Sequence, residues 1–93
     1  MIPTHIEPYQ HGGTLGELRI GWASWDEGHY QDRSIKWAYA DASGKISRGC
    51  PELPFEILVD MVIAAKRLGE LSDNDIAKIR KAFGGKKRLQ PEN

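Results

Sequence analysis

Cys50 is the one cysteine of the chain, and a nucleophilic role for its thiol would require a nearby base. The candidate bases are the three histidines, His5, His11 and His29. Cys50 precedes Pro51 at a predicted strand-to-helix junction, and no helix begins directly after it to lower its pKa. We therefore expect a buried or half-buried, inert thiol. A single cysteine cannot close an internal disulfide, which favours a reducing, cytoplasmic compartment.

Two polar clusters contain side chains of the types that bind metals. The first consists of His5, Glu7 and His11. Its spacing matches none of the zinc patterns. The second consists of Asp26, Glu27, His29 and Asp32. It lies in a predicted loop and lacks the alternating ligands and the distant glutamate of an EF-hand. We interpret both clusters as solvated surface, and we expect neither a metal nor a cofactor.

No pair of carboxylates has the pattern of a general acid and base. Glu56 and Asp60 are one turn apart on a predicted helix, which is typical of an exposed face. The glycine pairs Gly12-Gly13 and Gly84-Gly85 lack the flanking residues of a phosphate-binding loop. We therefore expect a protein that is not an enzyme, with a small hydrolase or metal enzyme as the least favoured class.

The aromatic side chains are concentrated in a predicted sheet and its first loop. They are Trp22, Trp25, Tyr30, Trp37 and Tyr39. Alternation along a strand places Trp25 on the face opposite Trp22, beside the acidic pair Asp26-Glu27. If exposed there, Trp25 would anchor a protein interface or stack on a base, whereas the alternative is that it packs back over its own sheet. We predict that Trp25 and Tyr30 contact a partner.

Charge is distributed unevenly, although the net charge is zero. Residues 1–75 hold 7 basic and 12 acidic side chains, whereas residues 76–91 hold 6 basic and no acidic ones. The candidate contacts to nucleic acid within this basic segment are Lys78, Lys81, Lys86, Lys87 and Arg88. Cations of this kind bind phosphates, and they also serve as a solubilising surface. Both interpretations stay open at this stage.

The elements that would position these residues begin with strands. Period-two alternation predicts one strand over residues 14–25, in which Gly21 marks a bulge or a close backbone approach, and a second over residues 33–40. Asp41-Ala42-Ser43-Gly44 is typical of a type I turn. It should lead into a short third strand over residues 45–48. We expect the chain before residue 14 to be an irregular arm.

A long apolar helix is predicted over residues 54–68, with Pro54 at its first position and Gly69 as its C-terminal stop. This helix is the expected centre of the core, with Leu58 and Val62 buried, because no other segment is as apolar. Its apolar residues surround most of the helix. They suggest self-association, for which Ile63 is the expected contact because it lies within a charged line.

A second helix is predicted over residues 73–83. Ser72 is the expected N-cap, and Asp75 lies three residues later as in a capping box. Gly84-Gly85 is the expected end of this helix, and residues 86–93 are the expected flexible basic tail.

The residues that join the two helices resemble the first helix and turn of helix-turn-helix DNA-binding proteins. The matching positions are Ala65, Leu68 and Gly69. That pattern also requires hydrophobic residues where this chain has Glu70 and Asp75. We therefore interpret the two helices as an ordinary antiparallel hairpin.

Together these patterns predict an α+β fold in which a three-stranded antiparallel sheet is followed by a two-helix C-terminal hairpin. Residues 1–13 form the arm, residues 14–85 one domain and residues 86–93 the tail. No signal peptide or membrane-spanning run is predicted. We expect a small binding or regulatory protein that docks to a macromolecule, such as an accessory or inhibitor protein of a bacterium, phage or mobile element. The most favoured partner is a protein, a homodimer is an open alternative, and the runner-up function is nucleic-acid binding.

Overall fold

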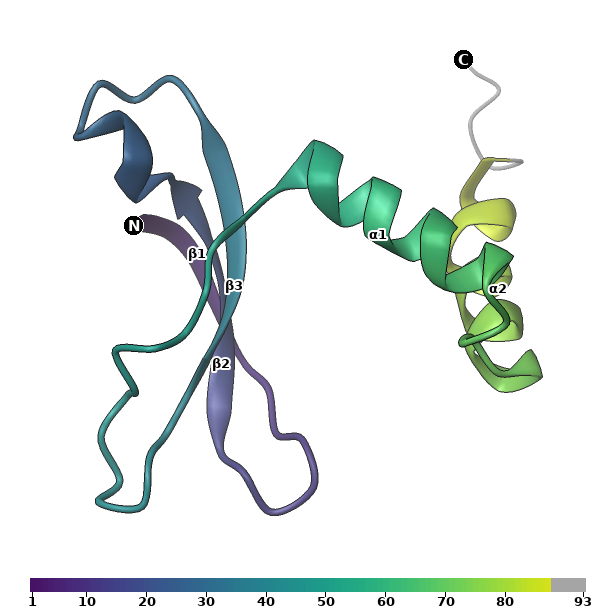
Figure 1. Ribbon diagram of the computed structural model, residues 1–93, viewed down its shortest axis with the longest axis horizontal. Coiled ribbons are helices and arrows are strands. Elements are labelled where there is room, and N and C mark those ends of the chain that lie inside the picture. Colours follow the sequence, from purple (N-terminus) through teal and green to yellow (C-terminus); the bar gives the residue numbers. More distant parts are fainter. Residues whose placement is uncertain (88–93) are drawn as a thin grey trace. The chain divides into compact units, whose positions relative to one another are not determined.

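The computed structural model describes residues 1–87 of the 93-residue chain. In chain order its elements are β1 (Ile2–Pro8), β2 (Gly16–Trp22), the 3-10 helix η1 (Ser24–Asp26), β3 (Arg33–Tyr39), β4 (Leu53–Pro54), α1 (Phe55–Arg67) and α2 (Asp73–Lys87) (Figure 1). An antiparallel sheet is thus followed by two helices, and the predicted α+β class is confirmed. The chain divides into two compact units, Met1–Val59 and a second that begins at Asp60. Within the described residues, no helix combines the length and hydropathy needed to cross a bilayer.

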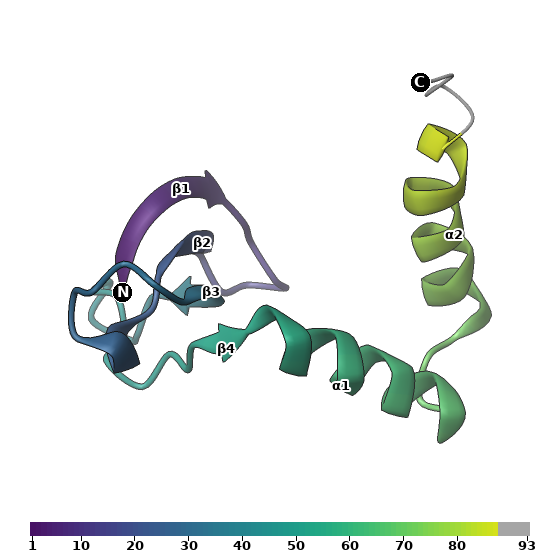
Figure 2. The same ribbon diagram turned by 90° about the horizontal axis from the view of Figure 1, so that it is seen from above.

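The first unit is an antiparallel sheet with the strand order β1-β2-β3-β4, which Figure 2 shows from above. The two central strands lie within the ranges predicted from alternation, and Leu18 pairs with Trp37 in their register. The prediction that the first of them continues to Trp25 is wrong: β2 ends at Trp22 and Trp25 belongs to η1, so strand alternation does not place its side chain. The predicted third strand over residues 45–48 is wrong. A single bridge joins Ala40 to Ile46, and β4 takes the place beside β3. The predicted turn is present, with the Gly44 N–H donating to the Asp41 carbonyl over 3.0 Å.

Residues 2–8 form the edge strand β1, where an irregular arm was expected. Its prolines suit this position, because an edge strand needs hydrogen bonds along only one side. The register shifts between Pro3 and His5, so Thr4 is an extra residue opposite β2. Gly21 lies directly opposite Pro3, and a Cβ atom on it would lie 2.1 Å from the Ile2 carbonyl oxygen. The close backbone approach predicted at Gly21 is confirmed.

Small side chains make up the buried core of the first unit. They are Ala23, Ser34, Ala38 and Cys50. The larger residues of the central strands, such as Leu18, Ile35 and Trp37, are only half-buried. They line an apolar pocket of about 390 Å³ together with Leu58. One face of the sheet is therefore closed by small residues, while the other remains partly open.

The predicted long helix is present as α1, but its expected role as the centre of the core is wrong. No residue of α1 is buried; Leu58 is half-buried and Val62 is exposed. The hydrophobicity of a segment measures its tendency to leave water, and it does not specify which surface will cover it.

Local signals determine where α1 ends and where α2 begins. Gly69 has a φ of +77°, and the Glu70 N–H donates to the Ala65 carbonyl, as in a Schellman motif. Ser72 and Asp75 form the predicted capping box, with two side-chain-to-backbone hydrogen bonds of 3.0 Å. The predicted end at residue 83 is wrong, because α2 continues through both glycines to Lys87. Glycine weakens a helix by about 1 kcal/mol without preventing it. Lys86 and Lys87, which were expected in the tail, therefore belong to α2. The remaining tail residues, 88–93, lie outside the described part of the chain.

Candidate docking site

The segment from Ala23 to Asp32, which we call the Trp25 loop, is closed by hydrogen bonds to one carboxylate. Asp26 Oδ2 accepts the backbone N–H groups of Gln31 and Asp32 over 3.0 and 2.8 Å. The backbone N–H of Asp32 lowers the pKa of Asp26, although burial opposes this shift. At the two ends of the loop, the Ala23 N–H donates to the Asp32 carbonyl over 2.9 Å. These contacts give the loop a defined backbone conformation.

The loop presents its two aromatic side chains to solvent. Trp25 is 44% exposed, and its Nε1 donates to Asp32 Oδ2 over 2.8 Å. Tyr30 is 58% exposed, and its ring meets the Trp22 ring edge to face at a centroid distance of 5.8 Å. The Arg33 guanidinium lies 4.5 Å from the centre of the Trp22 ring. Both candidate partner-binding aromatics are therefore held by neighbours and still accessible.

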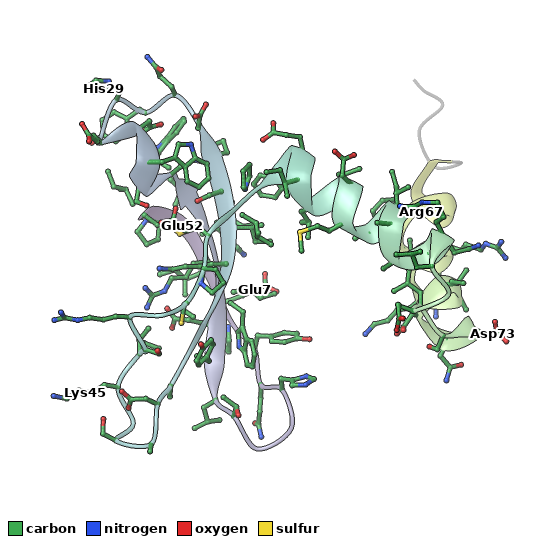
Figure 3. The ribbon with its side chains drawn as sticks, in the orientation of Figure 1. Glu7, His29, Lys45, Glu52, Arg67 and Asp73 are labelled. Atoms are coloured by element: carbon green, nitrogen blue, oxygen red, sulfur yellow. The ribbon has the colours of Figure 1, made fainter. Side chains whose placement is uncertain are left out.

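Glu52 anchors the start of this loop to the sheet. Its carboxylate accepts the Ser24 N–H over 3.1 Å, the Ser24 hydroxyl over 2.5 Å and the Ser34 hydroxyl over 2.9 Å. Burial by itself would raise the pKa of Glu52, but the hydrogen bonds from Ser24 and Ser34 lower it to about 2. Glu52 lies against the strands, whereas His29 lies at the outer end of the loop (Figure 3). Glu52 was not identified from the sequence, because an isolated acid between Pro51 and Leu53 carries no signal of a long-range contact.

A pocket of about 360 Å³ opens beside Trp25. Its lining residues are Trp25, Gln31, Asp32, Arg33, Pro54, Phe55 and Glu56. The lining combines an aromatic wall, two carboxylates and one guanidinium. Such a mixed pocket suits a polar or basic side chain inserted from a partner surface.

The residues considered for nucleophilic or metal chemistry have structural contacts. Cys50 is buried, and its sulfur accepts the Tyr39 N–H over 3.4 Å. His5 pairs with Glu7 on β1 over 2.8 Å, and the ring of His11 meets Trp37 edge to face. In the part of the chain that the structure describes, no three metal-binding side chains come together.

The remaining candidates lie in the second unit. Ile63 is exposed on α1 and lines a groove toward α2. Lys78 and Lys81 are exposed on α2. Lys86 and Lys87 belong to the last turn of that helix, and Arg88 lies outside the described residues. The sequence candidates thus form two sets, one in each unit: Trp25 with Tyr30, and Ile63 with the α2 lysines.

Comparison with known proteins gave no match to a family model, to a curated protein or to a solved structure.

Proposed function

We propose that this chain is a small, non-enzymatic binding protein that docks to another protein through the Trp25 loop. The observation that carries the proposal is the state of Trp25, which is 44% exposed while its indole N–H is fixed by Asp32. Tryptophan and tyrosine are enriched among the residues that dominate interface energies. A loop that is already ordered loses less conformational entropy on binding.

The charges around the loop favour a basic protein surface as the partner. Asp26, Glu27 and Asp32 belong to the loop, and Glu56 lines the adjacent pocket. The first unit, residues 1–59, holds 8 acidic and 5 basic side chains. A negative surface of this kind attracts basic partners and repels phosphates. The size of the chain suits a regulatory or inhibitory accessory protein of a bacterium, phage or mobile element, acting in the cytoplasm.

A pull-down from native lysate tests this function. We expect the chain to capture a protein that resists nuclease treatment and is lost with Trp25→Ala. Tyr9→Ala is the matched control, because Tyr9 is also a 44% exposed aromatic residue but lies outside the loop. Both variants should keep a cooperative thermal melt. Capture that survives Trp25→Ala, or that is lost equally with Tyr9→Ala, would contradict docking through this loop.

A second candidate function is nucleic-acid binding by α2. The observation that favours it is the continuation of the helix to Lys87, which places four lysines of the basic segment on one element. Lys78 and Lys81 are exposed there. Acidic side chains in this helix are confined to its first turn, at Asp73 and Asp75. After that turn, the exposed side chains of Lys78, Arg80 and Lys81 have no acidic neighbour on the helix, which suits phosphate contacts.

Salt dependence tests this second candidate. Binding to duplex DNA should weaken with a log–log slope of roughly −0.9 per phosphate contact, so that affinity detectable at about 50 mM salt nearly disappears by about 200 mM. The double variant Lys78→Ala/Lys81→Ala should reduce the slope by up to about two contacts. Lys45→Ala/Arg48→Ala in the first unit is the control of equal charge. If neither DNA nor RNA binds at low salt, α2 is not a nucleic-acid interface.

A further inference from the structure

One side of α1 carries a continuous apolar stripe, formed by Ile57, Met61 and Ala64 and extended by Leu68. Leu68 directly follows the helix and keeps its spacing, because its N–H donates to the Ala64 carbonyl over 3.0 Å. The spacing of four, three and four residues keeps these side chains on one face of a helix. The three large members are 46–66% exposed. The α1 residues that line the groove toward α2 are Val62, Ile63 and Lys66. At 100° per residue they point away from the stripe, so α2 does not cover it.

Two opposite charges flank the stripe along the same edge. Asp60 lies one residue before Met61, and Arg67 lies one residue before Leu68, so the two are separated by seven residues, or about two turns. Both side chains are exposed. Seven residues is the repeat that returns a side chain to the same position of a helix–helix contact. The edge of the stripe is therefore acidic at one end and basic at the other.

We infer that the apolar stripe is covered by the same stripe of a second copy, with the two α1 helices antiparallel. A two-fold axis between Met61 and Ala64 places Met61 against Ala64 of the second copy, and Ile57 against its Leu68. Asp60 then lies near Arg67 of the second copy, twice by symmetry. In a parallel contact the charged edges of the two helices would lie on opposite sides of the interface, so neither Asp60 nor Arg67 would meet an opposite charge. The charged edge is thus complementary to itself only in the antiparallel arrangement, which favours a second copy as the occupant and sets its direction.

The geometry also fits the sizes of the side chains. Ala64 is the small member of the stripe, and it leaves room for the long, flexible side chain of Met61 from the other copy. This interface does not use the Trp25 loop, so it is independent of the proposed docking function. It also differs from the self-association expected through Ile63, which lies on the α2 side of the helix.

The test measures molar mass by light scattering and the dimer dissociation constant by sedimentation equilibrium. At micromolar concentration the wild-type chain should form a species of twice its 10.4 kDa mass. Asp60→Arg and Arg67→Asp should each weaken the dimer at least about tenfold, because each leaves two like-charged contacts. The double variant Asp60→Arg/Arg67→Asp restores both pairs and should recover wild-type association. Mixing the two single variants should likewise give a heterodimer.

An apolar variant tests the stripe itself. Met61→Asp should give only the 10.4 kDa species, whereas Phe83→Asp, at an exposed apolar residue of α2 outside the stripe, should leave the dimer intact. A wild-type chain that stays at 10.4 kDa at micromolar concentration would overturn the inference. So would a dimer that Phe83→Asp disrupts as strongly as Met61→Asp. If the double variant Asp60→Arg/Arg67→Asp fails to restore association, the antiparallel arrangement is excluded. The charge variants test the arrangement even if Met61→Asp unfolds the chain.

Discussion

Replacing Glu52 by glutamine is expected to lower the free energy of unfolding of the first unit by about 2–4 kcal/mol. The carboxylate accepts three hydrogen bonds, from Ser24 and Ser34, and its side chain is only 12% exposed. A glutamine side chain has one acceptor oxygen in place of two. Its amide group also points two N–H donors toward a site where the Ser24 N–H and the Ser24 and Ser34 hydroxyls are already donors. The loss of a charge-assisted contact at a part-buried site has a cost of this size.

The same residue predicts how stability changes with pH. The pKa of Glu52 falls from 4.5 to about 2 on folding, so the unfolded chain binds more protons between these values. Stability should therefore be fully present above about pH 5, and should decrease as the pH falls toward 2. The total loss attributable to Glu52 is about 3 kcal/mol at 1.36 kcal/mol per pKa unit.

Urea unfolding at pH 6 and at pH 3 measures both effects. The pKa values of Asp26 and Asp41 are also lowered, by backbone and side-chain hydrogen bonds, so part of the acid dependence remains in every variant. The difference between Glu52→Gln and wild type isolates Glu52. Glu56→Gln is the control, because Glu56 is an exposed acid four residues further along the chain. An acid dependence in Glu52→Gln equal to that of wild type would show that this carboxylate is not the anchor.

Substituting Gly21 by alanine is expected to destabilise the sheet by about 1–3 kcal/mol, since overpacking against backbone has costs in this range. A Cβ atom there would lie 2.1 Å from the Ile2 carbonyl oxygen and 2.7 Å from the Pro3 Cα. Both atoms are backbone, so relief requires β1 to move away from β2. The strand pairs next to the bulge at Thr4 should be lost first.

Hydrogen exchange of the β1–β2 amides, together with the thermal midpoint, would show this effect. Gly13→Ala is the matched control, because Gly13 has open space at its Cβ position. The control should melt within a few degrees of wild type while Gly21→Ala melts well below it. Equal midpoints for the two variants would mean that β1 is not held as closely to β2 as described.

Much of the fold could be predicted from local patterns. The two central strands, the Asp41 turn, the Gly69 stop and the Ser72–Asp75 capping box all depend on residues within a few positions of one another. Such contacts leave a signature in the sequence, because the hydrogen bonds that define them connect near neighbours. The close approach at Gly21 was also visible, since only glycine fits such a position.

The features that could not be predicted depend on distant partners. β1 carries prolines and no alternation, yet an edge strand beside β2 accepts both. β4 has two residues, too few for any periodicity. The apolarity of α1 was recognised correctly, but the sequence cannot tell whether such a surface is covered by its own sheet or by another chain. In the candidate site, Trp25 and Tyr30 could be selected by residue type. Glu52 could not, because it accepts a hydrogen bond from Ser24, which lies 28 residues away in the sequence.

The most direct test of the docking function is the dissociation constant of the captured protein, measured by calorimetry with wild type, Trp25→Ala and Tyr9→Ala. Since a central tryptophan of an interface is worth 2 kcal/mol or more, Trp25→Ala should raise the dissociation constant by at least about 30-fold. Its thermal midpoint should stay close to that of wild type, because the side chain is 44% exposed. Tyr9→Ala should leave the dissociation constant within about twofold of wild type. An unchanged dissociation constant for a folded Trp25→Ala would contradict the proposal.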